Sequence, residues 1–360
     1  MRYDDDFVQY FEGRLQQVFL YVTDRCGLRC EQCLYKTTLA NREMDHQIAL
    51  AFLHDFRELG AEKLTFIGGE PTLYGRRAGN APLLELIERA FAWGYQYVRL
   101  DTNGQRLDHL LRAPDFQRLS NLSFSIDGHT AAVNDALRGR GTFERCIASL
   151  KLAVRLGYYT SITTCVHPGN VDHLDSMIDL AVSLGVAELN FHPLFKMGIA
   201  RDTFSGETDI SPEQWVAAFS ALRAGVDAGR YPIHVRAPQR FVATEQYLHD
   251  PERYEYCPTR MGERILVHPD GTLRICALCI GTPLKIATYD QERVQFCGWQ
   301  SEVSNERRQR RPCMGQVRDF NGLTPLCISY KPFQNEYVWL HEKVDQRLFS
   351  HGGVLQLAPR

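Results

Sequence analysis

Short apolar runs alternate with longer segments of helical spacing over the first half of the chain. The runs predict strands, and the segments between them, with apolar residues three or four positions apart, predict helices. The predicted strands are 18–22, 63–68, 97–101, 121–126, 159–166 and 188–193. The predicted helices are 45–60, 82–93, 106–112, 143–156 and 171–184. Six strands alternating with helices indicate an α/β fold with a parallel sheet, curled into a partial, TIM-like (β/α)6 barrel.

The pattern changes in the second half of the chain. A helix at 210–227 and an extended segment at 229–235 are predicted to close the barrel, and 238–250 to link it to a second domain. Strand, Pro269-Asp270-Gly271 turn and strand then predict a β-hairpin at 264–276. A last helix is expected at 334–349. The predicted domains are therefore the barrel at 1–237, a small domain at 238–333, and a C-terminal helix and tail at 334–360.

Composition narrows the class of protein. The 360 residues are 44% hydrophobic and 23% charged, with a net charge of −2 and no basic block, which argues against nucleic acid as a partner. The start has no signal-peptide pattern, and no apolar run reaches the ~20 residues of a membrane span. We therefore expect a cytoplasmic protein with no membrane partner. In a reducing compartment its 11 cysteines favour metal ligation over disulfides.

Three cysteines follow the first predicted strand directly. Cys26, Cys30 and Cys33 form a C-x3-C-x2-C array. Three thiolates on one loop can ligate three irons of a [4Fe–4S] cube, which leaves the fourth iron open to another ligand. A zinc site, or three ordinary reduced cysteines, are the alternatives.

The second predicted strand ends in Gly68-Gly69-Glu70-Pro71. Paired glycines allow a close backbone approach, and a carboxylate at a strand end can accept hydrogen bonds from an ammonium group. Together with the cysteine array, this motif resembles the radical S-adenosylmethionine (SAM) superfamily. The resemblance implies a partial barrel, SAM chelated by the open iron, its amino group held by this motif, and a 5′-deoxyadenosyl radical that abstracts hydrogen.

The later strand ends extend the resemblance. Thr102 and Asn103 belong to a TNG element, and Ser125 and Asp127 to an S-I-D-G element. Arg138 matches a family arginine that pairs with the SAM carboxylate. The resemblance implies SAM contacts for all five, whereas ordinary Asn-Gly and Asp-Gly turns and a solvated arginine are the alternatives.

The chain departs from the family at one position. Gln32 stands where an aromatic residue usually packs near adenine, and Tyr35 is the alternative for that role. Cys146 and Cys165, in a helix and a strand, are interpreted as core residues.

Six cysteines lie in the second domain. Cys257 and Cys276 fit C-x13-G-x4-C, which resembles the opening of SPASM and twitch auxiliary-cluster domains, whereas the full SPASM cysteine run is missing. The resemblance implies one auxiliary [4Fe–4S] cluster, with two as the minority view and a structural zinc as the alternative. Cys257 and Cys276 are its expected ligands, Cys313 and Cys327 complete the set, and Cys279 or Cys297 could replace either.

The resemblance implies a radical SAM oxidoreductase with an external one-electron donor such as flavodoxin or ferredoxin. The first hypothesis is two-electron oxidation of an alcohol to a ketone in a small sugar or aminocyclitol intermediate, as in antibiotic biosynthesis, with the auxiliary cluster accepting an electron. The short stretch before the first strand, without room for a leader-binding domain, favours it. The alternative is a peptide or protein maturase that forms a thioether, a carbon–carbon crosslink or formylglycine. An electron carrier or zinc scaffold is disfavoured by the GGEP motif. His192, Lys196 and His268 are possible bases, and none is assigned.

Overall fold

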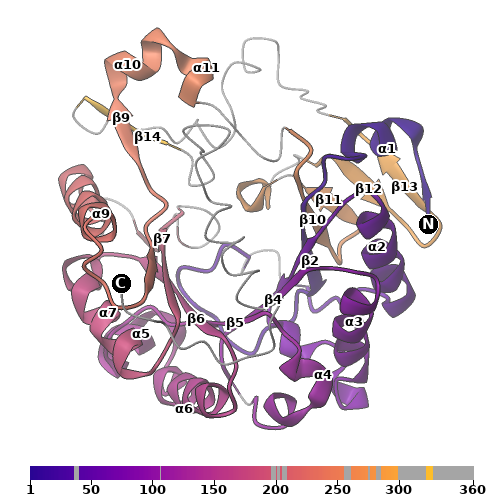
Figure 1. Cartoon of the computed structure of the whole chain (residues 1–360), viewed down its shortest axis with the longest axis horizontal. Helices are drawn as coiled ribbons and strands as arrows, with labels where there is room; N and C mark the ends of the chain where they lie inside the picture. Colours follow the sequence, from indigo (N-terminus) through magenta and orange to yellow (C-terminus); the bar gives the residue numbers. More distant parts are fainter. Residues whose placement is uncertain are drawn as a thin grey trace.

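The computed structural model describes residues 1–35, 40–105, 107–195, 200, 203–204, 209–254, 261–274, 276–280, 285–298 and 322–326. Within them, 12 strands form one sheet in the order β1-β13-β12-β11-β10-β2-β3-β4-β5-β6-β7-β8. Figure 1 shows the middle of this sheet as an arc with helices along its outer side. None of the described helices is long and apolar enough to cross a bilayer.

The arc is built of parallel strands, as predicted. They are β2 (Gln17–Thr23), β3 (Lys63–Gly68), β4 (Tyr97–Thr102), β5 (Asn121–Ser125), β6 (Thr160–Val166), β7 (Glu188–Pro193) and β8 (His234–Arg236). The helices between them are α2 (His46–Glu58), α3 (Ala81–Ala92), α4 (Pro114–Gln117), α5 (Ala131–Arg138), α6 (Thr142–Arg155), α7 (Leu174–Ser183) and α9 (Pro212–Asp227). The predicted partial (β/α)6 barrel is confirmed.

The helix expected at 106–112 is much shorter. The described part holds a 3-10 turn, Leu110–Arg112, followed by α4. The break falls at Ala113, which is extended (ψ 129°) because Pro114 follows it, and the proline then occupies the first position of α4. Helix α5, which the pattern did not predict, begins where the Thr130 hydroxyl accepts from the backbone N–H of Val133.

The predicted hairpin is present and extends the barrel sheet. It pairs β10 (Arg264–His268) with β11 (Thr272–Arg274), and β10 lies parallel to β2 with Leu266 opposite Phe19. Beyond it lie β12 (Ala287–Tyr289), β13 (Arg293–Phe296) and, at the edge, β1 (Arg2–Tyr3), which leads into α1 (Asp5–Phe11). The limits 1–237 and 238–333 stay a prediction.

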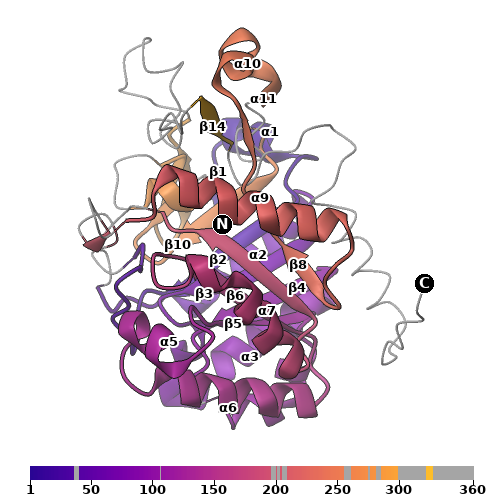
Figure 2. The ribbon, with the colours of Figure 1, turned by 90° about the vertical axis from the view of Figure 1, so that its left-hand side faces the viewer.

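The segment 238–250, predicted as a link, contains regular structure. Strand β9 (Phe241–Ala243) pairs with β14 (Leu323–Pro325), and the short helices α10 (Thr244–His249) and α11 (Pro251–Tyr254) follow it. Figures 1 and 2 place this unit beyond the open side of the arc. The helix expected at 334–349 lies outside the described residues.

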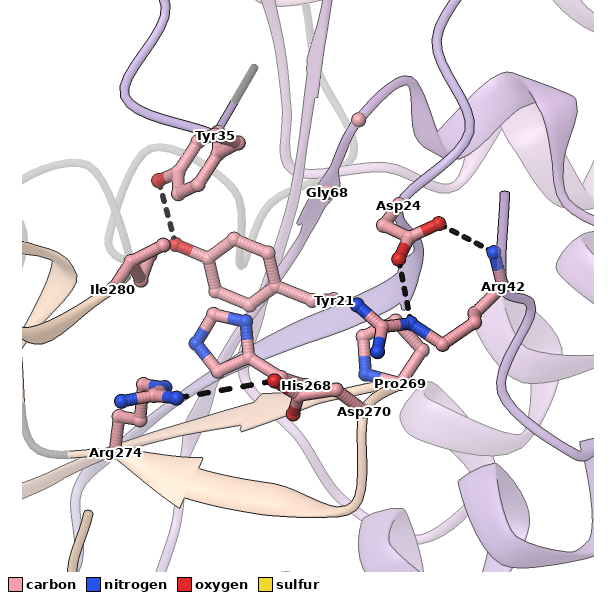
Figure 3. Close-up of a pocket in the computed structure, with 11 residues that line it drawn as sticks. Tyr21, Asp24, Tyr35, Arg42, Gly68, His268, Pro269, Asp270, Arg274 and Ile280 are labelled. Carbon is pink, nitrogen blue, oxygen red and sulfur yellow. Dashed lines mark hydrogen bonds and ion pairs between the residues drawn. The ribbon is translucent and has the colours of Figure 1, made fainter. Parts of the chain in front are cut away.

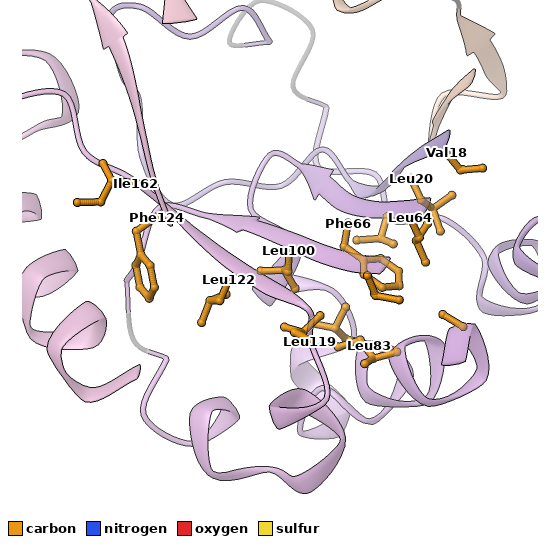
Figure 4. Packing of buried hydrophobic residues seen from close by; sticks show 14 of the residues in the cluster. Val18, Leu20, Leu64, Phe66, Leu83, Leu100, Leu119, Leu122, Phe124 and Ile162 are labelled. Atoms are coloured by element: carbon orange, nitrogen blue, oxygen red, sulfur yellow. The ribbon is translucent and has the colours of Figure 1, made fainter. Parts of the chain in front are cut away.

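The outer face of the arc is apolar. Leu64, Phe66, Leu100, Leu122 and Phe124 alternate along β3 to β5 and are fully buried. Figure 4 shows them packed with residues of the surrounding helices, such as Leu83 of α3. Each such side chain contributes roughly 1.5–3 kcal/mol by leaving water.

The inner face of β4 to β8 is polar at the alternate positions. Arg99 donates through Nε to Asp101 (2.5 Å) and through Nη2 to the hydroxyls of Ser123 (2.9 Å) and Thr163 (3.2 Å). A barrel interior is more commonly filled by branched apolar residues. The inner face of this barrel differs, because its alternate positions carry polar and charged side chains.

Candidate active site

The cysteine loop begins at the carboxyl end of β2 and is clamped by its neighbour β3. The N–H of Gly69 donates to the carbonyl of Thr23 (2.8 Å), and that of Glu70 donates to the carbonyl of Arg25 (2.7 Å). Further along, the N–H of Glu31 donates to the carbonyl of Leu137 (3.0 Å). The loop is thus fastened to the barrel on both sides of Cys26.

The paired glycines are required by this contact. A Cβ on Gly68, whose φ is +154°, would lie 2.2 Å from the Thr23 carbonyl oxygen, and one on Gly69 would lie 2.3 Å from that of Arg25. The close backbone approach predicted for these glycines is therefore present, and its partner is the cysteine loop itself. Pro71 begins the short helix that follows (Pro71–Leu73).

The three thiols of the loop are half-buried. The sulfur of Cys26 accepts from the N–H of Leu28 (3.4 Å) and from the side-chain amide of Asn103 (3.8 Å). Burial and, to a smaller extent, the charges of Glu70, Cys30 and Cys33 together raise the pKa of Cys26 to about 12. Thiols grouped this way would ionise only with a strong cationic partner, such as iron.

The donor set fits a [4Fe–4S] cube. The charges of Cys30 and Cys33 both act on Cys26, so the three thiols lie near one another. A cube gives each thiolate a different iron. Cys26, Cys30 and Cys33 therefore suit a three-iron attachment.

The side chain of Glu70 joins the ends of β3 and β4. Its Oε1 accepts from the hydroxyls of Thr72 (2.7 Å) and Thr102 (2.8 Å), and its Oε2 accepts from the N–H of Asn103 (2.7 Å). Burial raises the pKa of Glu70, and these hydrogen bonds oppose that rise. The carboxylate is held rigidly near Cys26. The structure thus brings together Glu70, Thr102 and Asn103, for which contact with SAM stays a prediction.

The buried carboxylate of Asp127 connects three further segments of the site. Its Oδ1 accepts from the N–H of Cys165 (2.7 Å), and its Oδ2 accepts from Nε of Arg138 (2.6 Å) and from the side-chain amide of Gln32. Gln32, the residue that departs from the family pattern, therefore fastens the cysteine loop to β5. Sequence reasoning missed this contact, which joins residues 95 positions apart, because no local pattern signals it.

The other barrel residues predicted from the sequence lie near Glu70 and Asp127. Arg138 is the last residue of α5, with only 13% of its side chain exposed, and its charge acts on Cys30. Ser125 ends β5 and is half-buried. Cys146 is buried in the core, as expected, and Cys165 is half-buried against a smaller apolar cluster.

Two cysteines of the second half approach the same region. Cys276 is half-buried, and Cys279 is buried in a short 3-10 turn whose carbonyl accepts from Arg274 (2.8 Å). Tyr35, two residues after Cys33, packs in a small apolar cluster with Ala277 and Ile280, which lie beside these two cysteines. Burial raises the pKa of Tyr35, and the charges of Cys33 and Cys276 add to that rise. Cys297 is half-buried just after β13. Cys257, Cys313 and Cys327 lie outside the described residues.

A cavity of about 90 Å³ opens beside the cysteine loop, which we call the turn cavity. Its walls come from the ends of β2 and β3 and from the hairpin turn (Figure 3). The Tyr21 and Tyr35 hydroxyls lie 2.8 Å apart, and the Tyr21 ring stacks on His268 at 4.0 Å between ring centroids. Because β10 is parallel to β2, His268 stands at the same end of the sheet as the cysteine loop.

The possible bases have different surroundings. His192 lies on the inner face of β7, where burial and then the charges of Arg99 and Arg236 lower its pKa to about 4. His268 is 7% exposed, and burial lowers its pKa to about 3. Both imidazoles are therefore neutral near pH 7, and each has one ring nitrogen that can accept a hydrogen bond. Lys196 lies outside the described residues.

Comparison with known families finds that residues 20–181 match the radical SAM superfamily. Among curated proteins, a GTP 3′,8-cyclase of Psychromonas ingrahamii is 27% identical over 42% of this chain, and the mycofactocin maturase MftC of Mycolicibacterium smegmatis is 29% identical over 46%. These matches span only 44% and 41% of the two relatives.

Solved structures share the fold over more of the chain. Streptococcus suis SuiB bound to precursor peptide SuiA covers 87% of this chain and 69% of its own, with a TM-score of 0.59 and 12% identity. The protein anSMEcpe with bound AdoMet covers 93% of this chain and 96% of its own, with a TM-score of 0.59 and 14% identity. The likeness extends past the barrel into the hairpin region. Residues 20–181, which carry the cysteine loop and the GGEP motif at adjacent strand ends, therefore form a domain of the radical SAM superfamily.

Proposed function

We propose that the chain is a radical SAM oxidoreductase that modifies a peptide or protein with the help of an auxiliary iron–sulfur cluster. The observation that carries this proposal is the packing of Tyr35, two residues after Cys33, in one apolar cluster with Ala277 and Ile280, which lie beside Cys276 and Cys279. Clusters held by these two cysteine sets would supply a hydrogen abstraction and then an acceptor for the electron that the substrate radical loses.

The residues that would hold the cofactors follow from the site. Cys26, Cys30 and Cys33 would hold the first cluster, and Cys276 and Cys279 would contribute to an auxiliary one, together with members of the set Cys257, Cys297, Cys313 and Cys327. When bound, the first cluster and SAM supply a 5′-deoxyadenosyl radical, and the auxiliary cluster supplies an electron acceptor. An external donor such as flavodoxin or ferredoxin would reduce the first cluster.

The protein's own groups would position SAM and control the proton. Glu70, fixed by Thr102 and Asn103, would accept hydrogen bonds from the SAM amino group. Arg138, oriented by Asp127, would face the SAM carboxylate. His192, neutral on the polar inner face, would accept the proton that a substrate radical releases on oxidation.

Peptide modification is favoured over the small-molecule hypothesis by the relatives. The mycofactocin maturase is similar in sequence, and both SuiB and anSMEcpe, which share the fold, have been solved with peptides bound. The similarity to GTP 3′,8-cyclases, which act on a small molecule, supports oxidation of a small molecule as the second candidate.

The test uses the full chain, reconstituted with iron and sulfide and reduced without oxygen. It is incubated with SAM and either short peptides encoded beside its gene or sugar and aminocyclitol alcohols. We expect a peptide product lacking two hydrogens, with 5′-deoxyadenosine formed in equal amount. Oxidation of the alcohols without any change in the peptides would establish the second candidate instead.

A further inference from the structure

The ion pair on the inner face of β4 leaves one acceptor atom unused. Oδ1 of Asp101 accepts from Nε of Arg99 (2.5 Å), whereas its Oδ2 accepts no hydrogen bond from the described residues. The side chain of Asp101 is 23% exposed, against 15% for Arg99. Oδ2 is also absent from the described polar atoms that are both unpaired and closed to solvent. A ligand can therefore reach this oxygen, and a carboxylate oxygen is a strong acceptor.

The exposed part of Asp101 faces the inside of the barrel. Strand β4 lies in the middle of the arc, and helices cover the outer side of that arc (Figure 1). Val98 and Leu100, which point to the helices, are fully buried. Because successive side chains alternate, Arg99 and Asp101 point the other way. The unused oxygen is thus accessible from inside the barrel.

Asp101 is also close to the expected cofactor site. The next residue, Thr102, donates to Glu70 (2.8 Å). The side-chain amide of Asn103 lies 3.8 Å from the sulfur of Cys26. Cα atoms two positions apart on a strand are separated by roughly 7 Å. A group bound to Asp101 would therefore lie beside the residues that would hold SAM and the first cluster.

The neighbours of Asp101 differ on its two sides. On β3, the adjacent inward position is Ile67, which packs with Tyr21 in an apolar cluster. On β5, Ser123 pairs with Asp101 and contributes a hydroxyl. A group bound at Asp101 therefore meets an apolar surface on one side and polar side chains on the other.

The charge of Asp101 is compensated by Arg99. The guanidinium is fixed in turn by the hydroxyls of Ser123 (2.9 Å) and Thr163 (3.2 Å). Because the ion pair is neutral as a whole, a cationic group gains less here than beside a lone carboxylate, and an anion is repelled by Oδ2. An uncharged donor is the best partner for this oxygen. A hydroxyl on a short stem, as in Ser or Thr, supplies the donor and fits between the apolar and polar sides.

We propose that Asp101 is a specificity-determining residue whose Oδ2 accepts a hydrogen bond from the hydroxyl of a Ser or Thr side chain in the peptide substrate. This inference rests on the proposed function, since it assigns the hydroxyl to a peptide. Arg99 holds Oδ1, so the carboxylate presents Oδ2 to the ligand.

The experiment measures binding to the reconstituted full chain with SAM present. The probes are blocked tripeptides Ac-Gly-X-Gly-NH₂ in two matched pairs, X = Ser against Ala and X = Thr against Val, and methyl glucoside as a hydroxylated non-peptide. We expect Ser and Thr to bind about tenfold more tightly than Ala and Val, the lower end for a hydrogen bond to a charged group. Equal binding within both pairs overturns the role of Asp101 and leaves peptide modification intact, whether or not any variant folds.

Asp101→Asn reverses the hydrogen-bonding character of the same atom position. Nε of Arg99 can only donate, so the amide oxygen of the variant faces Arg99 and its NH₂ group takes the place of Oδ2. The preference for Ser and Thr should fall to about threefold or less, because a neutral amide replaces a charged acceptor. A further pair, X = O-methylserine against norvaline, tests the reversal, since the ether oxygen of O-methylserine can only accept. Only the variant should bind O-methylserine more tightly than norvaline.

Asp55→Asn is the matched control and should keep the full preference. Asp55 lies on α2 outside the barrel, is 25% exposed and pairs with the N-terminal ammonium group (3.2 Å). Iron content and thermal midpoint establish that each variant is folded. An unchanged preference in Asp101→Asn overturns the role of Asp101. Binding of methyl glucoside alone, weakened in Asp101→Asn, supports the hydroxyl acceptor and overturns the peptide function, and no binding of any probe overturns the role of Asp101.

Discussion

The two faces of the barrel sheet are built from the same strands but differ in chemistry. On β4, the outward residues Val98 and Leu100 are fully buried against helices, while the inward residues Arg99 and Asp101 form a half-buried ion pair. On β7, Phe191 faces the core, whereas His192 faces inward. The outer face supplies stability, and the inner face and its rim carry polar groups that such a core would not need.

Successive side chains of a strand point to opposite faces of the sheet. One strand can therefore bury apolar residues on its outer face and present polar residues on its inner face. The outward positions can bury apolar area while the inward positions and the strand ends vary with the chemistry. Changes at the rim should therefore affect activity and leave stability nearly unchanged, and changes on the outer face should do the reverse. The following variants test that separation.

The largest effect is expected at the rim. Replacing Cys26, Cys30 and Cys33 together by Ala should abolish 5′-deoxyadenosine formation from SAM under dithionite, because three irons lose their thiolates. The thermal midpoint of the apoprotein should change little, since these side chains are half-buried on a loop. Cys146→Ala, a buried core cysteine outside the array, should retain 5′-deoxyadenosine formation. Continued formation by the triple variant would refute the cluster assignment.

A buried outer-face residue should give the opposite pattern. Phe124→Ala removes a fully buried ring and should lower the free energy of unfolding by about 3–5 kcal/mol. Denaturant unfolding of the apoprotein measures this loss. At a temperature where the variant is folded, its SAM cleavage should approach that of the wild type. A loss below 1 kcal/mol would mean that the outer face contributes less than its burial indicates.

A buried inner-face carboxylate links stability to pH. Burial opposes the charge of Glu188, but Arg236 and His234 lower its pKa from 4.5 to about 2. Because the folded-state pKa is depressed, the stabilisation is present above about pH 4.5 and is lost as the pH falls toward 2. The shift corresponds to roughly 3 kcal/mol. Glu188→Gln should remove that part of the pH dependence, as measured by denaturant unfolding at pH 5 and pH 3, and an unchanged slope would contradict it.

The smallest effect is expected on the inner face beside Arg99. Ser123→Ala removes one acceptor, but Asp101 and Thr163 still hold the guanidinium. Ser123 also shares a hydrogen bond with the Thr163 hydroxyl (3.0 Å). The free energy of unfolding should fall by about 1.5 kcal/mol, the lower end of the range for a hydrogen bond to a charged group, because the other partners of Arg99 remain. A loss as large as that of Phe124→Ala would show that a single polar contact of the inner face stabilises the fold as much as a buried ring.

The sequence predicted the local parts of this architecture and missed the long-range ones. Strands such as Lys63–Gly68 and Glu188–Pro193 were predicted at their observed limits, because apolar alternation and terminal Gly or Pro mark them. Strand β13 was missed because it depends on Asp4, which accepts from the N–H of Phe296 from the other end of the chain. The local sequence around β13 does not show that Asp4 will be its partner.

The same holds for the site. The cysteine array, GGEP and the later strand ends were found from spacing, and the structure places Glu70 beside Thr102 and Asn103. The attachment of Gln32 to Asp127 and the stacking of Tyr21 on His268 join distant segments and needed the fold. The sequence shows that Arg99 and Asp101 are polar positions within a strand. Only the sheet shows that they face the inside of the barrel.

The central claim is that two cysteine sets, each holding a cluster, face one interior around Tyr35. Electron paramagnetic resonance of the reduced, fully reconstituted chain tests it most directly, with Cys276→Ala/Cys279→Ala as the comparison. The account predicts roughly eight irons in the wild type, given four per cube, and a first-cluster signal with faster relaxation caused by the second cluster. The double variant should retain roughly four irons and show the slower relaxation of an isolated cluster. Identical iron content and relaxation in the two proteins would contradict the account.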